Sequence, residues 1–296
     1  MSTPTAPISA PRGWFSRRRA LQGAGFVAVA GAVGAAYTRL LEPDWLEVTH
    51  RTAQLGSTPA PPVRVLHLSD LHASRFVSLE FIAKAVRLGL AEKPALVCLT
   101  GDFITKHFAR FADYADVLKP LAAAAPTFAC LGNHDGGKWA ARPQYGGYVD
   151  HSEVRRCLTA SGATVLLNQS QPVTLRGRNL RLVGLGDLWS DEQRPAEAFG
   201  TEPPPAETGV IALMHNPDGK EQLASFHWHL ALCGHTHGGQ LRLPFFGTPF
   251  APVRDHRYVA GLHRWRDRWL HVTRGVGNLH GVRFNCRPEV SLLTLT

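Results

Sequence analysis

Short apolar runs alternate with amphipathic segments along much of this 296-residue chain, and that alternation limits the folds it can adopt. Residues 63–70 and 95–102 are apolar runs typical of buried strands. Residues 78–92 carry apolar side chains at helical spacing, with Ser78 as a candidate N-cap. The pattern continues with helices expected at 108–124 and 151–162, and strands at 127–135, 164–170, 173–187, 209–216 and 229–237. Alternation of this kind indicates β-α-β units and a largely parallel sheet.

The strand content after residue 164 is higher than one doubly wound sheet would hold. We therefore predict an α/β fold with two packed mixed β-sheets flanked by helices. The C-terminal segments 257–277 and 289–296 alternate in polarity, and we expect them to form hairpins.

The N-terminal residues 1–42 have the pattern of an export signal. Arg17, Arg18 and Arg19 precede a mostly small and apolar stretch, Ala20–Tyr37, as a charged region precedes the apolar region of a signal peptide. The paired arginines resemble a twin-arginine signal. The alternative is a membrane-anchoring helix, since the stretch approaches the length that spans a bilayer. No A-x-A cleavage site is evident, so removal of the signal stays open. Residues 43–62, which include the Pro-rich stretch 56–63, are interpreted as a linker to a folded domain at 63–296.

Charge and cysteine content restrict the function classes further. The net charge is +9, but residues 1–42 contribute five arginines against one glutamate, so the rest of the chain is only mildly basic. That balance fits an anionic substrate or membrane headgroups, and also an ordinary basic protein. The cysteines are five, an odd number without a C-x-x-C pair, and three of them lie within apolar strand-like runs. We interpret them as small core residues.

Polar clusters follow the carboxyl ends of five predicted strands. In open α/β sheets, these ends are where ligand sites are built. The last cluster, GHTHGGQ, places two histidines around one threonine among glycines, which permit backbone conformations that turn side chains toward a shared point. The polar residues are Asp70 and His72, Asp102, Asn133 with His134 and Asp135, His215, and His235 with His237.

Taken in order, these clusters resemble the signature of the calcineurin-like metallophosphoesterases over residues 63–237. GHTHGGQ and the later RFNCRPEV are similar to the exported bacterial branch, related to phosphodiesterases described as hydrolysing UDP-2,3-diacylglucosamine. The resemblance implies a four-layer αββα sandwich, a catalytic domain at 63–296, and two divalent metal ions. Mixed oxygen and imidazole ligands suit Mn, Fe or Zn.

The resemblance also implies a role for each residue. One metal would be held by Asp70, His72, Asp102 and His237, and the second by Asp102, Asn133, His215 and His235. Such a metal pair would supply an acidified water as the nucleophile for phosphorus. His134 would protonate the leaving group, with Asp135 fixing its tautomer.

The implied function is hydrolysis of a phosphodiester or pyrophosphate bond in an envelope or lipid-linked substrate. Implied partners are that substrate, a membrane surface or N-terminal anchor, and the twin-arginine export machinery, with a location in the periplasm or on the outer face of the inner membrane. A UDP-linked lipid precursor would be expected on the cytoplasmic side, so the natural substrate stays open. FITKH after Asp102 lacks the Asp-Arg of protein phosphatases, which argues against that activity.

Three alternatives stay open at this point. A phosphomonoesterase would use the same site. An exported nuclease would use the Arg-rich tail with Trp265 and Trp269 to bind phosphates and stack on bases. We favour a solvated hairpin or a headgroup-facing surface for that tail, so nucleic acid is not the expected partner. A non-catalytic scaffold is the least favoured, because every ligand position is filled.

Overall fold

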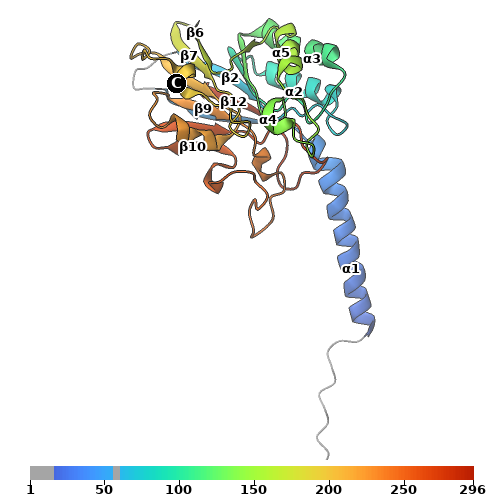
Figure 1. Cartoon of the computed structure of the whole chain (residues 1–296). Helices are drawn as coiled ribbons and strands as arrows, with labels where there is room; N and C mark the ends of the chain where they lie inside the picture. Colours follow the sequence, from blue (N-terminus) through green and yellow to red (C-terminus); the bar gives the residue numbers. More distant parts are fainter. Residues whose placement is uncertain (1–16, 56–60) are drawn as a thin grey trace, which may run out of the picture.

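The computed structural model describes residues 17–55 and 61–296. Residues 1–16 of the predicted export signal and residues 56–60 of the Pro-rich stretch lie outside the described residues. Helix α1 (Arg17–Ala36) continues through a π-helical turn (Tyr37–Leu41) and a 3-10 turn (Glu42–Asp44) into the folded domain. The segment Leu21–Asp44 has a mean hydropathy of 1.5 and is long and apolar enough to cross a membrane. Figure 1 shows α1 projecting away from the domain.

Two six-stranded mixed sheets form the centre of the domain, which confirms the predicted architecture. The first sheet has the strand order β1-β12-β2-β3-β4-β5, and the second has the order β10-β11-β9-β8-β7-β6. The first sheet consists of β1 (Glu47–Ala53), β2 (Val63–Leu68), β3 (Leu96–Thr100), β4 (Thr127–Cys130), β5 (Thr164–Val165) and β12 (Glu289–Leu295). The second consists of β6 (Gln169–Leu175), β7 (Arg178–Gly184), β8 (Gly209–Leu213), β9 (Leu230–Cys233), β10 (Gly261–Trp265) and β11 (Arg268–Val272).

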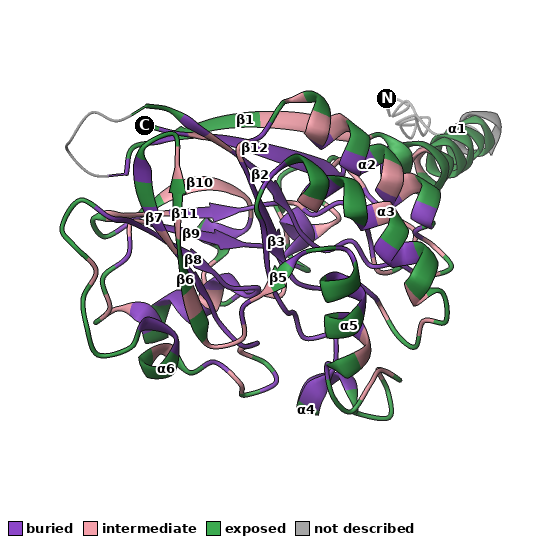
Figure 2. Cartoon of the chain, turned by 90° about the horizontal axis from the view of Figure 1, so that it is seen from above, coloured by how far each residue is buried: buried purple, intermediate pink, exposed green. Residues whose placement is uncertain are grey.

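Helices cover the outer faces of the sheets. The longer ones, α2 (Leu79–Ala91), α3 (Phe111–Ala124) and α5 (Ser152–Ala160), pack on the first sheet, while α6 (Pro195–Phe199) lies on the second. A short helix, α4 (Gly137–Ala140), follows β4. Ser78 caps α2 as predicted, since its hydroxyl accepts a hydrogen bond from the backbone amide of Phe81 at 3.1 Å. Figure 2 shows the buried strands beside these helices, each of which has a buried and an exposed face.

Alternation along the strands explains why two sheets stack. In β2, Val65 points into the core between the sheets, whereas its neighbour Leu66 packs against the helices. In β8, Ile211 faces the core between the sheets and Ala212 faces the outer layer. Both faces of these central strands are therefore apolar, as expected for strands buried on two sides. All five cysteines are buried and free, three of them in β3, β4 and β9, which confirms their interpretation as core residues.

Two predictions about the chain's organisation were wrong. Residues 43–62 are not only a linker, because they contain β1, an edge strand of the first sheet that pairs in parallel with β12. Its residues are mostly polar and half-buried or exposed, so no apolar run marks it. The C-terminal tail forms one hairpin, β10–β11, whereas β12 enters the first sheet between β1 and β2.

Candidate metal centre

The loops that follow β2, β3, β4, β8 and β9 bring the predicted ligands together at one end of the two sheets. Three groups of side chains each offer ligand atoms within 4.8 Å of one another. These groups are Asp70 with His72 and His237, Asp102 with His215 and His235, and His72 with Asp102 and His134. Asp102 and His72 each belong to two groups, so the clusters are continuous.

Asp102 lies at the junction between the two halves of this cluster. Its Oδ2 is 3.4 Å from Nε2 of His72 and 3.1 Å from Nε2 of His215. On the first side, Nε2 of His72 lies 3.1 Å from Nε2 of His237. On the other side, Nε2 of His215 lies 3.2 Å from Nδ1 of His235. One carboxylate oxygen thus faces both imidazole pairs, as a bridging ligand would.

Several buried polar atoms of the cluster that could bind a metal have no hydrogen-bond partner among the described residues. Asn133 Oδ1 is one of them, although Asn133 is only 1% exposed. Buried polar atoms are nearly always paired, and an unpaired one calls for an explanation. A divalent cation would satisfy both this amide oxygen and the imidazole nitrogens that face one another. The residues present therefore fit divalent metal binding.

Backbone conformation directs the ligands toward a common point. Five of them adopt positive φ, a region that costs a residue with a Cβ on the order of 1–3 kcal/mol. These are Asp70 (53°), His72 (47°), Asp102 (55°), His235 (70°) and His237 (50°). Gly234 lies so close to the site that an added Cβ would be 1.9 Å from Oγ of Ser69 and 2.2 Å from Oδ2 of Asp70. Strain of this kind, concentrated in one cluster, is characteristic of a functional site.

His134 lies beside the ligands, and its tautomer is fixed by the backbone. Its Nδ1 is 2.8 Å from the carbonyl oxygen of Thr105, which can only accept a hydrogen bond, so Nδ1 carries the proton. This leaves Nε2 as the nitrogen available to the cleft that His134 lines. Burial lowers the pKa of His134 to about 4, against the charge of Asp102, which raises it.

Among the described residues, no hydrogen bond joins Asp135 to the His134 ring, so Asp135 does not fix its tautomer as predicted. Its carboxylate accepts hydrogen bonds of 2.7–2.8 Å from the backbone amides of Asp102, Phe103 and Gly132. These amides belong to the loops after β3 and β4, so Asp135 ties the two loops together and holds Asp102 in place. Burial and the nearby charge of Asp102 raise the pKa of Asp135 to about 7.

The electrostatics of the cluster favour a cation. Burial alone would lower the pKa of His215, but the adjoining Asp102 carboxylate raises it to about 10. For Asp102 the directions are reversed. Burial alone would raise the pKa of its carboxyl group, but the adjoining His215 holds that pKa well below its usual range. In the protein alone, a proton on His215 thus balances the charge of Asp102. A metal ion would take over that role, because imidazole binds metal in its neutral form.

The cluster opens into a cleft of about 740 Å³. One wall is aromatic: Trp139 stacks on Tyr145 with ring centroids 3.7 Å apart, and Trp189 meets the His235 ring edge-on at 4.2 Å. Basic side chains lie at the rim, namely Arg75, Lys106, His107 and His280. His107 and His280 belong to none of the sequence motifs, and the structure places both in the cleft lining.

Sequence reasoning also missed Asp187, which follows the carboxyl end of β7 as Asp102 follows that of β3. Its side chain is fully buried, and Oδ2 accepts a 2.6 Å hydrogen bond from the backbone amide of Ser190. Its Oδ1 has no hydrogen-bond partner in the described part of the chain, and burial raises the pKa of Asp187 to about 6. The signal was present, since GLGD repeats the pattern of an apolar run that ends in Gly-Asp.

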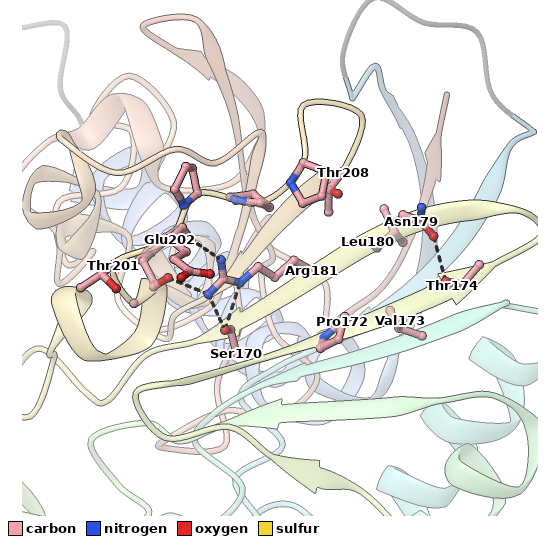
Figure 3. A pocket seen from close by; sticks show the side chains of 15 residues that line it. Ser170, Pro172, Val173, Thr174, Asn179, Leu180, Arg181, Thr201, Glu202 and Thr208 are labelled. Carbon is pink, nitrogen blue, oxygen red and sulfur yellow. Dashed lines mark hydrogen bonds between the residues drawn. The ribbon is translucent and has the colours of Figure 1, made fainter.

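A second cavity, of about 610 Å³, lies beside β6, β7 and the proline-rich loop before β8 (Figure 3). The Arg181 guanidinium bonds Ser170 Oγ and the carbonyl oxygens of Phe199 and Glu202. Its donors are therefore directed at the protein rather than at a ligand. None of the candidate metal clusters found among residues 17–55 and 61–296 lies there. The cleft at the metal cluster is accordingly the candidate functional site.

Two packed mixed sheets with a carboxylate, amide and imidazole cluster at the ends of their strands define a class, the metal-binding phosphoester hydrolases. The sequence profile of the calcineurin-like phosphoesterases matches residues 63–239, and the chain belongs to this family.

Relatives of the chain extend over nearly its whole length. It is 44% identical to "Phosphodiesterase YaeI" of Escherichia coli K12, over 95% of this chain and 99% of that protein. It is 30% identical to "Uncharacterized metallophosphoesterase YkuE" of Bacillus subtilis, over 95% of this chain and 97% of that protein. It is 27% identical to "UDP-2,3-diacylglucosamine pyrophosphatase LpxG" of Chlamydia muridarum, over 86% and 90%. The predicted family, fold and hydrolase class are confirmed.

Proposed function

We propose that this protein hydrolyses a phosphodiester or pyrophosphate bond with two divalent metal ions, of Mn, Fe or Zn type, bound in the cluster around Asp102. The observation that carries the proposal is the position of the Asp102 carboxylate between two imidazole pairs. A relative named as a phosphodiesterase, similar over almost the entire chain, supports the diester preference.

The metal ions would be held by Asp70, His72, Asp102 and His237 on one side, and by Asp102, Asn133, His215 and His235 on the other. When bound, such ions supply an acidified water and neutralise charge on the phosphoryl oxygens. The chain's own groups do the rest. The loops hold the ligands through backbone bonds, and the buried position of the cluster keeps bulk water from competing.

His134 is the group we assign to leaving-group protonation. Because Nδ1 is held by the Thr105 carbonyl, the proton would be delivered from Nε2 into the cleft. Its low pKa in the free protein means that the negative charge of a bound phosphate is needed to favour the protonated ring. The rim residues Arg75 and Lys106 would attract that phosphate.

The natural substrate is proposed as an envelope or lipid-linked phosphoester. LpxG, the pyrophosphatase relative, acts by its name on UDP-2,3-diacylglucosamine, which carries acyl chains and a phosphoanhydride. We transfer the chemical class rather than the compound, since an exported enzyme would not meet a cytoplasmic UDP-linked precursor. The apolar segment Leu21–Asp44 supports a membrane location.

The Arg-rich tail gives no support to a nuclease. Trp265 is buried, and the Arg266 and Arg268 guanidinium groups lie over its ring. Trp269 is covered by Arg264, whose guanidinium carbon is 3.8 Å from the ring centroid. A ring face engaged in this way is not free to stack on a base. Arg283 is fully buried, and its guanidinium bonds backbone carbonyls. Nucleic acid is thus not proposed as a partner.

Export by the twin-arginine machinery to the periplasm, or to the outer face of the inner membrane, is part of the proposal. It rests on Arg17, Arg18 and Arg19 before the apolar stretch. Replacing all three by Lys should leave folded, active protein in the cytoplasm. Unchanged export of that variant would point to another route or to a simple membrane anchor.

The activity is tested with the purified, metal-reconstituted chain against bis-p-nitrophenyl phosphate, p-nitrophenyl phosphate, DNA and a nucleotide-linked lipid. We expect a higher kcat/KM for the diester than for the monoester, and no hydrolysis of DNA. Turnover of the monoester alone would overturn the diester preference, and the phosphomonoesterase alternative would replace it.

A further inference from the structure

Exposed aromatic side chains gather on the loop at residues 241–250, which we call the aromatic loop. Phe245, Phe246 and Phe250 on this loop have exposed fractions of 104%, 78% and 65%. Large apolar side chains gathered on an exposed surface mark an interaction site. Residues 37–45, which join α1 to the domain and which we call the base of α1, show the same feature. Their side chains Leu40, Leu41 and Trp45 are 68%, 61% and 53% exposed.

The base of α1 is attached to the domain by hydrogen bonds. The carbonyl oxygen of Thr38 accepts from the backbone amide of Arg283 at 2.9 Å. The Glu42 carboxylate is fully buried and accepts from the backbone amides of Asn285, at 2.9 Å, and Cys286. These contacts hold the segment in place, because hydrogen bonds from amides to a carboxylate are stronger than those between neutral groups. The helix is thus docked on the domain at its base and is not a free tether there.

Residues 283–286, which bind the base of α1, also contact the aromatic loop and the loop that carries the predicted ligand His237. Phe284 donates its backbone N–H to the carbonyl of Gln240 at 3.0 Å and accepts from the backbone amide of Arg242 at 2.8 Å. The Cys286 thiol lies 3.1 Å from the carbonyl oxygen of His237. The helix base, the aromatic loop and the ligand loop therefore form one connected unit. In Figure 1 the orange and brown loops that follow β9 extend to the same side of the domain as α1.

We propose that the aromatic loop is a second membrane-docking element, which inserts its phenylalanines into the surface of the bilayer that α1 spans. Arg39 and Arg242 are exposed beside the apolar side chains, and the Arg287 guanidinium lies 4.1 Å above the Trp45 ring. Aromatic and basic side chains together are typical of the membrane interface, where the cations meet anionic headgroups.

The loop's position gives this docking a consequence for catalysis. Pro252, which follows the aromatic loop in the chain, lines the cleft. Leu279 also lines the cleft, and its backbone amide donates a hydrogen bond to Oε1 of Gln240 at 3.4 Å. The cleft mouth therefore lies beside the docking surface. A substrate with its acyl chains in the bilayer would present its phosphodiester to the cleft without leaving the membrane. This consequence rests on the proposed phosphodiesterase function, whereas the docking itself does not.

Labelling of the full chain tests the docking. All five native cysteines are buried, so Phe246→Cys would provide one reactive thiol for an environment-sensitive fluorophore. The matched control is Gln171→Cys, exposed on edge strand β6, which lies at the end of the domain away from α1 in Figure 1. In vesicles of phosphatidylethanolamine and phosphatidylglycerol with nitroxide-labelled lipid, we expect a blue shift and quenching at position 246 only. Equal quenching at the two positions would overturn the proposal.

A triple variant tests the consequence for substrate access. Phe245→Ser, Phe246→Ser and Phe250→Ser together should leave hydrolysis of water-soluble bis-p-nitrophenyl phosphate unchanged, which also reports correct folding. For a p-nitrophenyl phosphodiester carrying an acyl chain embedded in the same vesicles, kcat/KM should fall about tenfold or more. Equal kcat/KM for wild type and variant on the embedded substrate would refute the role in access. Position-specific quenching in the labelled variants, together with a wild type that hydrolyses neither diester, would support docking and overturn the proposed function instead.

Discussion

Gly101 and Gly177 both have a positive φ but differ in their surroundings. Replacing each of them by alanine therefore separates the cost of backbone strain from the cost of crowding at the site. Gly101, between β3 and Asp102, has a φ of 83°, and Gly177, in the β6–β7 turn, has a φ of 75°. An alanine in this left-handed region costs about 1–2 kcal/mol at either position. Around Gly177 an added Cβ meets nothing within 4 Å. At Gly101 it would lie 2.5 Å from the backbone nitrogen of Gly132 and 2.8 Å from Nδ1 of His215.

The extra contact at Gly101 sets the size of the expected effect. To reach ordinary van der Waals contact, the loop after β4 or the His215 ring must move by roughly an ångström, and overpacking of this kind costs about 1–3 kcal/mol. A misplacement of about 1 Å in an active site reduces the rate about 10²-fold. Gly101→Ala should therefore lower both the melting temperature and the metal content more than Gly177→Ala does.

The assay compares kcat/KM for bis-p-nitrophenyl phosphate, bound metal and melting temperature in both variants. Gly177→Ala controls for backbone strain, and we expect its kcat/KM to match that of the wild type. If Gly101→Ala had the same kcat/KM and metal content as Gly177→Ala, the packing of Gly101 against the site would not control the ligand geometry, and the reasoning would fail.

Three further predictions follow from single residues. Asp102→Asn should abolish activity and lower the metal content measured by elemental analysis, because both ions lose a shared anionic ligand; two bound metals with wild-type turnover would show the assignment to be wrong. His134→Asn should keep its metals and lose about 10²–10⁴-fold on alkyl diesters but much less on p-nitrophenyl esters, whose leaving group needs little protonation; equal losses would exclude general acid catalysis. The third prediction concerns Glu289. Burial alone would raise the pKa of its carboxyl group, but contact with Arg274 lowers that pKa to about 2, below its ordinary 4.5. The resulting stabilisation, about 3 kcal/mol, is present above pH 4.5 and is lost as the pH falls toward 2. Unfolding followed against pH should show this loss in the wild type and not in Glu289→Gln.

The sequence predicted those parts of the fold that depend on local pattern. Central strands such as β3 and β8 are apolar on both faces, so their runs stand out, and the polar residues that follow them mark the site. Strand β1 escaped prediction because it is an edge strand with mostly polar side chains. The placement of β12 escaped it as well, since its partners β1 and β2 are more than two hundred residues away in the chain.

The candidate site was likewise predicted only in part: its side-chain ligands were predicted, whereas its contacts with the backbone were not. Side chains that can act as ligands belong to residue types with recognisable chemistry. Six of the seven predicted ligands belong to the three clusters, and the seventh, Asn133, lines the cleft. Interactions with the backbone leave no such trace. Asp135 binds amide groups of the β3 and β4 loops, and the carbonyl of Thr105 fixes the His134 tautomer. Any residue supplies an amide or a carbonyl, so neither contact could be read from residue identity.

The central claim is that the cluster around Asp102 is a dinuclear metal site that hydrolyses phosphodiesters. The most direct measurement removes metal from the full chain with a chelator and then titrates Mn²⁺ back, recording bound metal per chain and turnover of bis-p-nitrophenyl phosphate in the same samples. The account predicts no turnover without metal and full recovery as two ions bind per chain. Turnover by the metal-free protein, or recovery without bound metal, would contradict it.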